Sequence, residues 1–165
     1  MKIEFLKNEI FILTIMGAFQ HNPIYATNVS ESDKINLKKN IKLLLRNLEN
    51  NYIQKVSETK HLIYLDKLKS DIEINNRRVL KNGLISYGTI QKILNLYLKY
   101  LWCANFIKEP PQCPIDRIIL NRLGDYKTSW TKMNKEEYYA IVQKIHLVKR
   151  NLSVAEWELR EFARR

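Results

Sequence analysis

The sequence contains few of the residues that interrupt or cross-link a chain. Among its 165 residues there are only 4 glycines, 4 prolines and 2 cysteines. The two cysteines, Cys103 and Cys113, exclude a disulfide framework and a four-cysteine zinc or iron–sulfur site. Because most segments between the glycines and prolines place apolar residues at helical spacing, the sequence predicts an all-α fold with one domain over residues 1–165.

The sequence also lacks any apolar run long enough to cross a membrane. Residues 10–19 have the length of a signal-peptide core, but Glu4 and Glu9 precede them and no small-residue cleavage site follows. We therefore expect a first core helix, a cytoplasmic location and no membrane partner. The three histidines are scattered and no glycine-rich phosphate-binding motif occurs, so we expect neither a metal nor a cofactor.

Acidic residues are few relative to basic ones. The chain has 28 lysines and arginines against 17 aspartates and glutamates, a net charge of +11. The excess lies in two flanks, with 12 basic and 7 acidic residues in positions 31–82 and 9 and 5 in positions 127–165. Such a balance favours a polyanionic partner, of which nucleic acid is the commonest, although it is also compatible with an ordinary lysine-rich surface.

Helical periodicity and capping residues divide the chain into successive helices. Ser30 or Ser32 is the expected N-cap of the second helix, and Cys113 that of a short helix ended by Gly124. Asn134 with Glu137 and Ser153 with Glu156 form two possible capping boxes, so the C-terminal region is either one helix or two. The second helix is expected to run through Leu37, Ile41, Leu44 and Leu48, and the others are expected at residues 3–20, 52–70, 88–106 and 114–123. In the C-terminal region, apolar residues from Tyr138 to Phe162 form one helical stripe.

The segment from Ser86 to Gly124 carries the chemistry. Lys92 lies on an almost wholly apolar helix, where a buried lysine is costly unless it has a partner or a function. Asp116 follows after a loop long enough to double back along that helix, so the two side chains are expected to meet. The alternatives are that Lys92 extends to solvent along the polar side of the helix and that Asp116 only caps the next helix.

The same segment resembles a known family. The sequence CPIDRIILNRLG, which contains Asp116-Arg117, resembles the catalytic-aspartate segment of helix-hairpin-helix DNA glycosylases, in particular the archaeal-type 8-oxoguanine glycosylases. The sequence SYGTIQKILNLYLKYL resembles the hairpin and the lysine-bearing helix of those enzymes. The resemblance covers about 40 residues. It implies a compact multi-helix domain in which the helix-hairpin-helix and the catalytic-type segment occupy about residues 76–124.

The resemblance implies that the protein is a base-excision glycosylase and abasic-site lyase acting on an 8-oxoguanine-like damaged base in double-stranded DNA. Lys92 would be the Schiff-base lysine and Asp116 its acidic partner. The aromatic residues Trp102 and Trp130 are candidates for stacking on the extruded base. The residues expected to contact DNA are Ser86, Tyr87, Gly88, Gln91, Lys99 and Arg117.

Two other functions are compatible with the sequence. The first is a non-catalytic basic helical protein that binds DNA, and the second is a helical protein-interaction module of a defence or toxin–antitoxin system that uses the C-terminal stripe. The glycosylase hypothesis requires Lys92 and Asp116 to lie within a few ångströms at a pocket. The interaction module requires the stripe from Tyr138 to Phe162 to be exposed.

Overall fold

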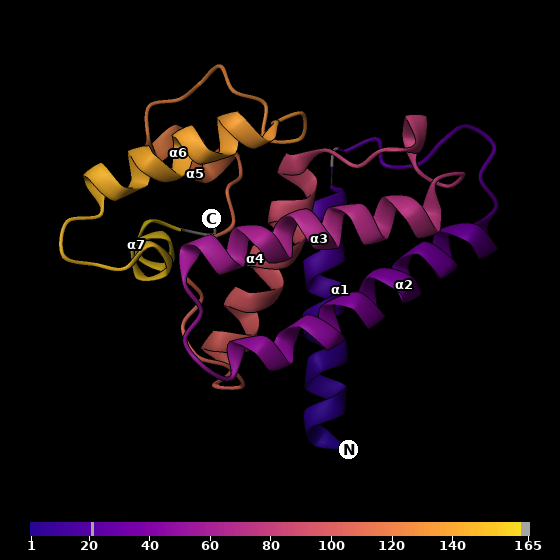
Figure 1. Ribbon diagram of the computed structural model, residues 1–165, viewed down its shortest axis with the longest axis horizontal. Helices are drawn as coiled ribbons and strands as arrows, with labels where there is room; N and C mark the ends of the chain where they lie inside the picture. The colour runs from indigo at the N-terminus through magenta and orange to yellow at the C-terminus, as the bar shows by residue number, and fades with distance from the viewer. Residues whose placement is uncertain (21, 163–165) are drawn as a thin grey trace.

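The structure is a computed structural model that describes residues 1–20 and 22–162, and it is helical throughout these ranges apart from loops (Figure 1). The described ranges contain no β-strand, and their one β-bridge joins Tyr25 to Leu80. The all-α prediction is thus confirmed. Seven α-helices occur in these ranges: α1 (Lys2–Phe19), α2 (Glu31–Glu49), α3 (Glu58–Asn76), α4 (Tyr87–Cys103), α5 (Arg117–Arg122), α6 (Lys135–Val148) and α7 (Val154–Glu161).

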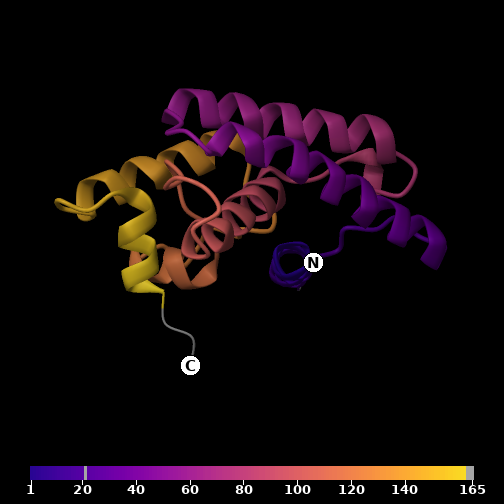
Figure 2. The same cartoon turned by 90° about the horizontal axis from the view of Figure 1, so that it is seen from below.

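Helix α4 is the centre of the fold. Every residue from Tyr87 to Lys99 is buried, including the polar residues at positions 89, 91, 92, 95 and 99. Helices α1, α2, α3 and α6 all contact α4. Figure 2 shows α2 and α3 as a layer on one side of α4, α1 end-on beyond it, and α5 to α7 grouped at one end. A helix that is surrounded in this way must be apolar on most of its circumference, as this sequence is.

Side-chain caps set where most helices begin. The Ser30 hydroxyl accepts the Asp33 N–H at α2, and both predicted capping boxes form, at Asn134 with Glu137 and at Ser153 with Glu156. The C-terminal region is therefore two helices.

Their predicted common stripe is divided between core and surface. Tyr138, Ile141 and Ile145 are fully buried in the core, whereas Val148 and Leu159 are about half exposed. The chain turns between α6 and α7 at Arg150, whose φ is +53°. Most of the stripe thus serves core packing rather than forming an exposed surface.

The predicted bounds of three helices differ from the structure. The helix expected at 88–106 ends at Cys103. The helix expected at 52–70 begins only after Ser57, which caps α3 through the Lys60 N–H, and it continues to Asn76. The helix expected at 114–123 with Cys113 as its N-cap begins instead at Arg117, because the Asp116 side chain accepts the free N–H groups of Ile118 and Ile119. Gly124, with φ of +69°, follows the end of α5 as expected.

None of the helices in the described part of the chain is both long enough and apolar enough to span a membrane.

Gly88 is required where α4 meets the loop before α6. Its N–H donates to the Met133 carbonyl over 2.9 Å, and an added Cβ would lie 1.6 Å from the Trp130 carbonyl oxygen. We expect Gly88→Ala to lower the free energy of unfolding by about 1–3 kcal/mol, because the loop must move away. Gly17→Ala is the matched control in a urea titration, since its Cβ would meet only the flexible end of Leu96. Equal losses of unfolding free energy in the two variants would contradict the explanation that the loop at Trp130 excludes a Cβ at position 88.

Candidate active site

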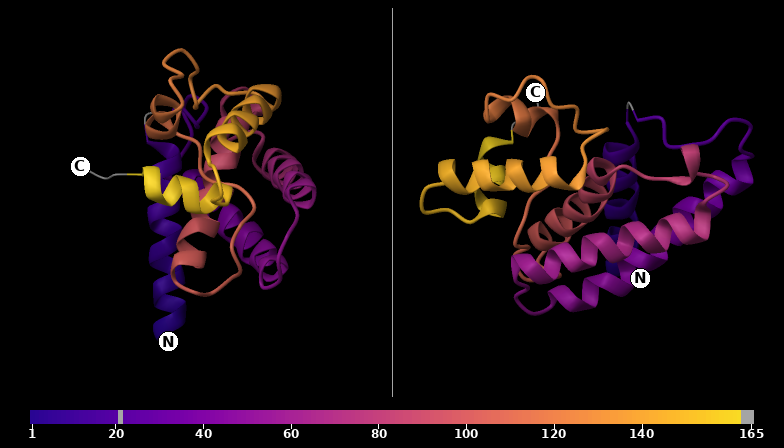
Figure 3. Two further views of the ribbon diagram at one scale, coloured as in Figure 1. Left: turned by 90° about the vertical axis from the view of Figure 1, so that its left-hand side faces the viewer. Right: turned by 45° about the horizontal axis from the view of Figure 1, so that its top comes forward.

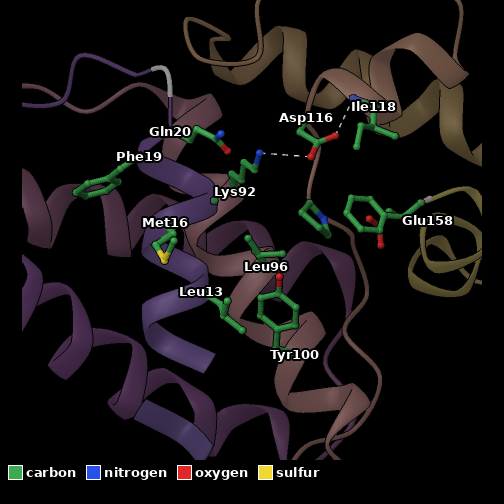
Figure 4. Close-up of a pocket in the computed structure, with 13 residues that line it drawn as sticks. Leu13, Met16, Phe19, Gln20, Lys92, Leu96, Tyr100, Asp116, Ile118 and Glu158 are labelled. Carbon is green, nitrogen blue, oxygen red and sulfur yellow. Dashed lines mark hydrogen bonds and ion pairs between the residues drawn. The ribbon is translucent and has the colours of Figure 1, made fainter. Parts of the chain in front are cut away.

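The chain after α4 doubles back along the helix and places Asp116 beside Lys92. Figure 3 shows this loop rising from the C-terminal end of α4 to α5. The Lys92 Nζ lies 3.3 Å from Asp116 Oδ2 and donates a hydrogen bond to it, while Oδ1 of the same carboxylate accepts the N–H groups at the start of α5 (Figure 4). The predicted meeting of the two side chains is therefore confirmed.

Burial has the largest effect on the pKa of Lys92. The removal of water from around the amine lowers its pKa, and the opposite charge of Asp116 counteracts part of that shift. The ammonium also lies 4.1 Å from the centroid of the Trp130 ring, which favours its charged form. The side chains of Lys92 and Asp116 remain 10% and 17% exposed, so a substrate can reach both. A lysine in this setting is more readily neutral, and hence nucleophilic, than one on the surface.

A pocket of about 650 Å³ adjoins the pair. This volume falls within the range of about 300–1,000 Å³ that is typical of ligand pockets. Its walls are mostly apolar and come from α1, α4, the loop before α5, and α7 (Figure 4). The lining residues are Leu13, Met16, Gly17, Phe19, Gln20, Lys92, Leu96, Tyr100, Pro114, Asp116, Ile118, Glu158 and Phe162.

A second buried ion pair lies at the other end of this pocket. Lys99, two turns after Lys92 on α4, contacts the Glu158 carboxylate of α7 at 2.8 and 2.9 Å. The side chains are only 8% and 2% exposed, and the Lys99 ammonium lies 4.0 Å from the Phe162 ring centroid. Burial raises the pKa of Glu158, against the opposing effect of Lys99. Lys99, expected to contact DNA, is thus occupied by a partner within the protein.

The three residues expected to form a DNA-binding hairpin lie at the start of α4. The Ser86 hydroxyl accepts the Thr89 N–H as the N-cap of the helix. Tyr87 is buried, with its ring 5.4 Å from that of Tyr138. Gly88 is buried as well, and its N–H is already bonded to a carbonyl. All three residues shape the beginning of the helix that carries Lys92.

The other residues predicted to contact DNA or to stack on a base lie in different parts of the fold. Gln91 is fully buried and bonds to the backbone before Asp116. Arg117 donates to the carbonyls of residues 125 and 128, which holds the loop after α5. Trp130 lies over the Lys92 ammonium, whereas Trp102 packs on the core near the C-terminal end of α4. Neither of these two base-stacking candidates lines the pocket.

Sequence reasoning did not identify Glu158 or the apolar wall from α1 as parts of this site. Within residues 1–20 and 22–162, no three histidine, cysteine or acidic side chains lie close enough to share a metal ion. The charged side chains that line the pocket are Lys92, Asp116 and Glu158. Comparisons with models of protein families, with curated proteins and with solved structures gave no match to this chain.

Proposed function

We propose that the protein is a DNA glycosylase with lyase activity that uses Lys92 to form an imine with the sugar of a damaged nucleotide. The observation that carries this proposal is the contact of the Lys92 amine, whose pKa burial lowers, with the Asp116 carboxylate beside a pocket. The proposed substrate is a duplex with an 8-oxoguanine-like base, in keeping with the net charge of +11. We further propose that α3, the turn at Lys81–Gly83 and α4 form the helix-hairpin-helix.

The chemistry begins with the extruded base in the pocket. The lone pair of the neutral Lys92 amine forms a bond to C1′, the bond from C1′ to the base breaks, and its electron pair leaves with the base, which takes up a proton. Asp116 stabilises the positive charge that develops on the sugar and accepts a proton from the amine. The nitrogen lone pair then forms the C=N bond as the C1′–O4′ bond breaks, and O4′ takes up the proton held by Asp116. Loss of the proton at C2′ from the resulting protonated imine expels the 3′ phosphate.

Borohydride trapping tests this proposal directly, because hydride reduces the imine to a stable secondary amine. We expect wild-type protein to form a covalent adduct with duplexes that contain 8-oxoguanine or an abasic site. Lys92→Gln should form none. Lys108→Gln, which changes an exposed lysine beyond the other end of α4, is the matched control and should trap like wild type.

Asp116→Asn separates imine formation by Lys92 from removal of the damaged base. Asparagine is also a good N-cap, so α5 should persist. An abasic site already presents an aldehyde and needs only a neutral amine, so trapping on it should survive. Because Asp116 raises the pKa of Lys92, its loss lowers that pKa, and trapping should extend to lower pH. Excision of the damaged base should fall at least about 100-fold, the lower end of the range for a lost proton-transfer group.

Three outcomes would overturn the proposal. An adduct that persists in Lys92→Gln would assign the chemistry to another amine. The absence of any wild-type adduct, together with salt-sensitive DNA binding, would identify a non-catalytic DNA-binding protein. The absence of both would favour the protein-interaction module.

A further inference from the structure

Two buried amide side chains of α4 hold the chain segment that leads into Asp116. The Gln91 side-chain amide pairs with both backbone groups of Ile115, as a neighbouring β-strand would. Its Nε2 donates to the Ile115 carbonyl over 2.7 Å, and its Oε1 accepts the Ile115 N–H over 3.0 Å. Nε2 also donates to the Gly88 carbonyl over 2.9 Å. Gln91 is fully buried, so these bonds do not compete with water.

Asn95, one turn after Gln91 on α4, holds the same segment, and the hydrogen bonds of these two side chains to residues 113–115 are called the clamp below. The two N–H groups of Asn95 Nδ2 donate to the Cys113 carbonyl over 2.9 Å and to the Tyr138 hydroxyl over 3.0 Å, and the nitrogen makes a longer, shared contact of 3.3 Å with Gln91 Oε1. The Tyr138 hydroxyl in turn donates to the side chain of Gln112. Residues 112–115 are therefore attached to α4 and α6 by side chains that are buried and hydrogen-bonded to one another.

The clamp thus fixes the position of Asp116 relative to Lys92. Gln91 immediately precedes Lys92 on α4, and Ile115 immediately precedes Asp116. On the other side of Asp116, its Oδ1 accepts the N–H groups of Ile118 and Ile119 at 2.9 and 3.2 Å. Asp116 is held from both sides, by the clamp before it and by the start of α5 after it.

We infer that Gln91 is a positioning residue that keeps Asp116 Oδ2 against the Lys92 amine, with Asn95 as the second part of the same clamp. The inference rests on the proposed lysine chemistry. It assigns Gln91 a role different from the DNA contact expected from the sequence. Displacement of a catalytic group by about 1 Å can cost about 100-fold in rate, so a clamp of this kind acts on turnover as well as on stability.

Gln91→Met tests the inference because methionine has a similar shape and makes none of these hydrogen bonds. We expect the variant to fold, to keep trapping on abasic-site DNA and to lose at least about tenfold in base excision. The pKa of Lys92 should fall, as in Asp116→Asn, because the carboxylate is no longer held beside the amine. Leu101→Ala, a fully buried change on the same helix, is the control for lowered stability.

An NMR titration of the Lys92 13Cε resonance reports whether Asp116 lies beside the Lys92 amine, and it needs no substrate. The groups around the amine are Asp116 and the Trp130 ring, with the Lys99–Glu158 pair further along the pocket. Gln91 is uncharged, and its side-chain bonds go to Gly88, Ile115 and Asn95. A lower midpoint in Gln91→Met than in wild type and Leu101→Ala would therefore report displacement of Asp116.

The combined variant Gln91→Met/Asp116→Asn completes the test. If Gln91 acts through Asp116, the double variant should have the same Lys92 midpoint and the same excision rate as Asp116→Asn alone. An unchanged midpoint in Gln91→Met would overturn the inference, and so would effects that add to those of Asp116→Asn. The absence of wild-type trapping would instead count against the proposed function, while the NMR midpoints would still decide the role of Gln91.

Discussion

Replacing Lys99 by methionine is expected to lower the free energy of unfolding by about 3–5 kcal/mol at neutral pH. Methionine fills a similar volume but leaves the Glu158 carboxylate buried without its partner. That carboxylate has a side chain only 2% exposed, and within residues 1–20 and 22–162 no other ion pair replaces the contact with Lys99 at 2.8 Å. The cost therefore comes from an uncompensated buried charge rather than from lost packing.

The loss should depend on pH in a defined direction. Burial already raises the pKa of Glu158, and removal of Lys99 raises it further. A carboxyl whose pKa is higher in the folded than in the unfolded state is most favourable to stability when protonated. The deficit of Lys99→Met should thus be largest above the folded-state pKa of Glu158 and should shrink as the pH falls toward the unfolded value of about 4.3. Urea titrations at pH 7.5, 6.5 and 5.5 measure this.

Two variants make the result interpretable. Lys135→Met breaks a surface ion pair with Asp66, in which the side chains are 38% and 44% exposed, and should cost at most about 1 kcal/mol. Lys99→Met/Glu158→Leu replaces the whole buried pair with apolar groups and should recover most of the lost stability. The explanation is wrong if Lys99→Met and Lys135→Met lose equal amounts, or if the double variant is as unstable as Lys99→Met.

Local interactions were the part of this structure that the sequence predicted well. The capping boxes at Asn134 and Ser153 involve residues three positions apart, so the pattern alone identifies them. The meeting of Lys92 with Asp116 followed from the length of one helix and the reach of one loop. In each case the relevant geometry is contained in a short, continuous stretch of chain.

Interactions that depend on the packing of distant elements were not predicted. Glu158 lies 59 residues after Lys99 on an amphipathic helix, where a glutamate normally faces solvent. Gln91 bonds to the backbone of Ile115, and a backbone acceptor leaves no signature in the sequence. The start of α5 was misplaced for a related reason, since Pro114 is compatible with a first helical residue but the Asp116 side chain forms the actual cap.

A different buried group should make the protein sensitive to mild acid. His61 on α3 is fully buried, and its Nδ1 lies 2.8 Å from the Tyr52 hydroxyl. Donation from that hydroxyl leaves the ring proton on Nε2. Among the residues that the structure describes, neither His61 Nε2 nor Asn95 Oδ1 has a hydrogen-bond partner. Asn95 is the neighbour that favours the protonated ring. Burial outweighs that effect and lowers the pKa of His61 to about 3.

We expect this histidine to dominate the loss of stability between pH 6.5 and pH 5. Below its unfolded pKa of about 6.5, His61 binds a proton only in the unfolded state, so stability falls by about 1.4 kcal/mol for each pH unit until the folded pKa is reached. Carboxylates with a lowered pKa, such as Glu4, Glu31 and Asp125, contribute to the pH dependence only at lower pH. Urea midpoints across this range should show the slope in wild type and in His146→Gln, whose side chain is 28% exposed. His61→Gln should remove it, and a slope that disappears in His146→Gln instead would assign the acid sensitivity to the surface pair with Glu58.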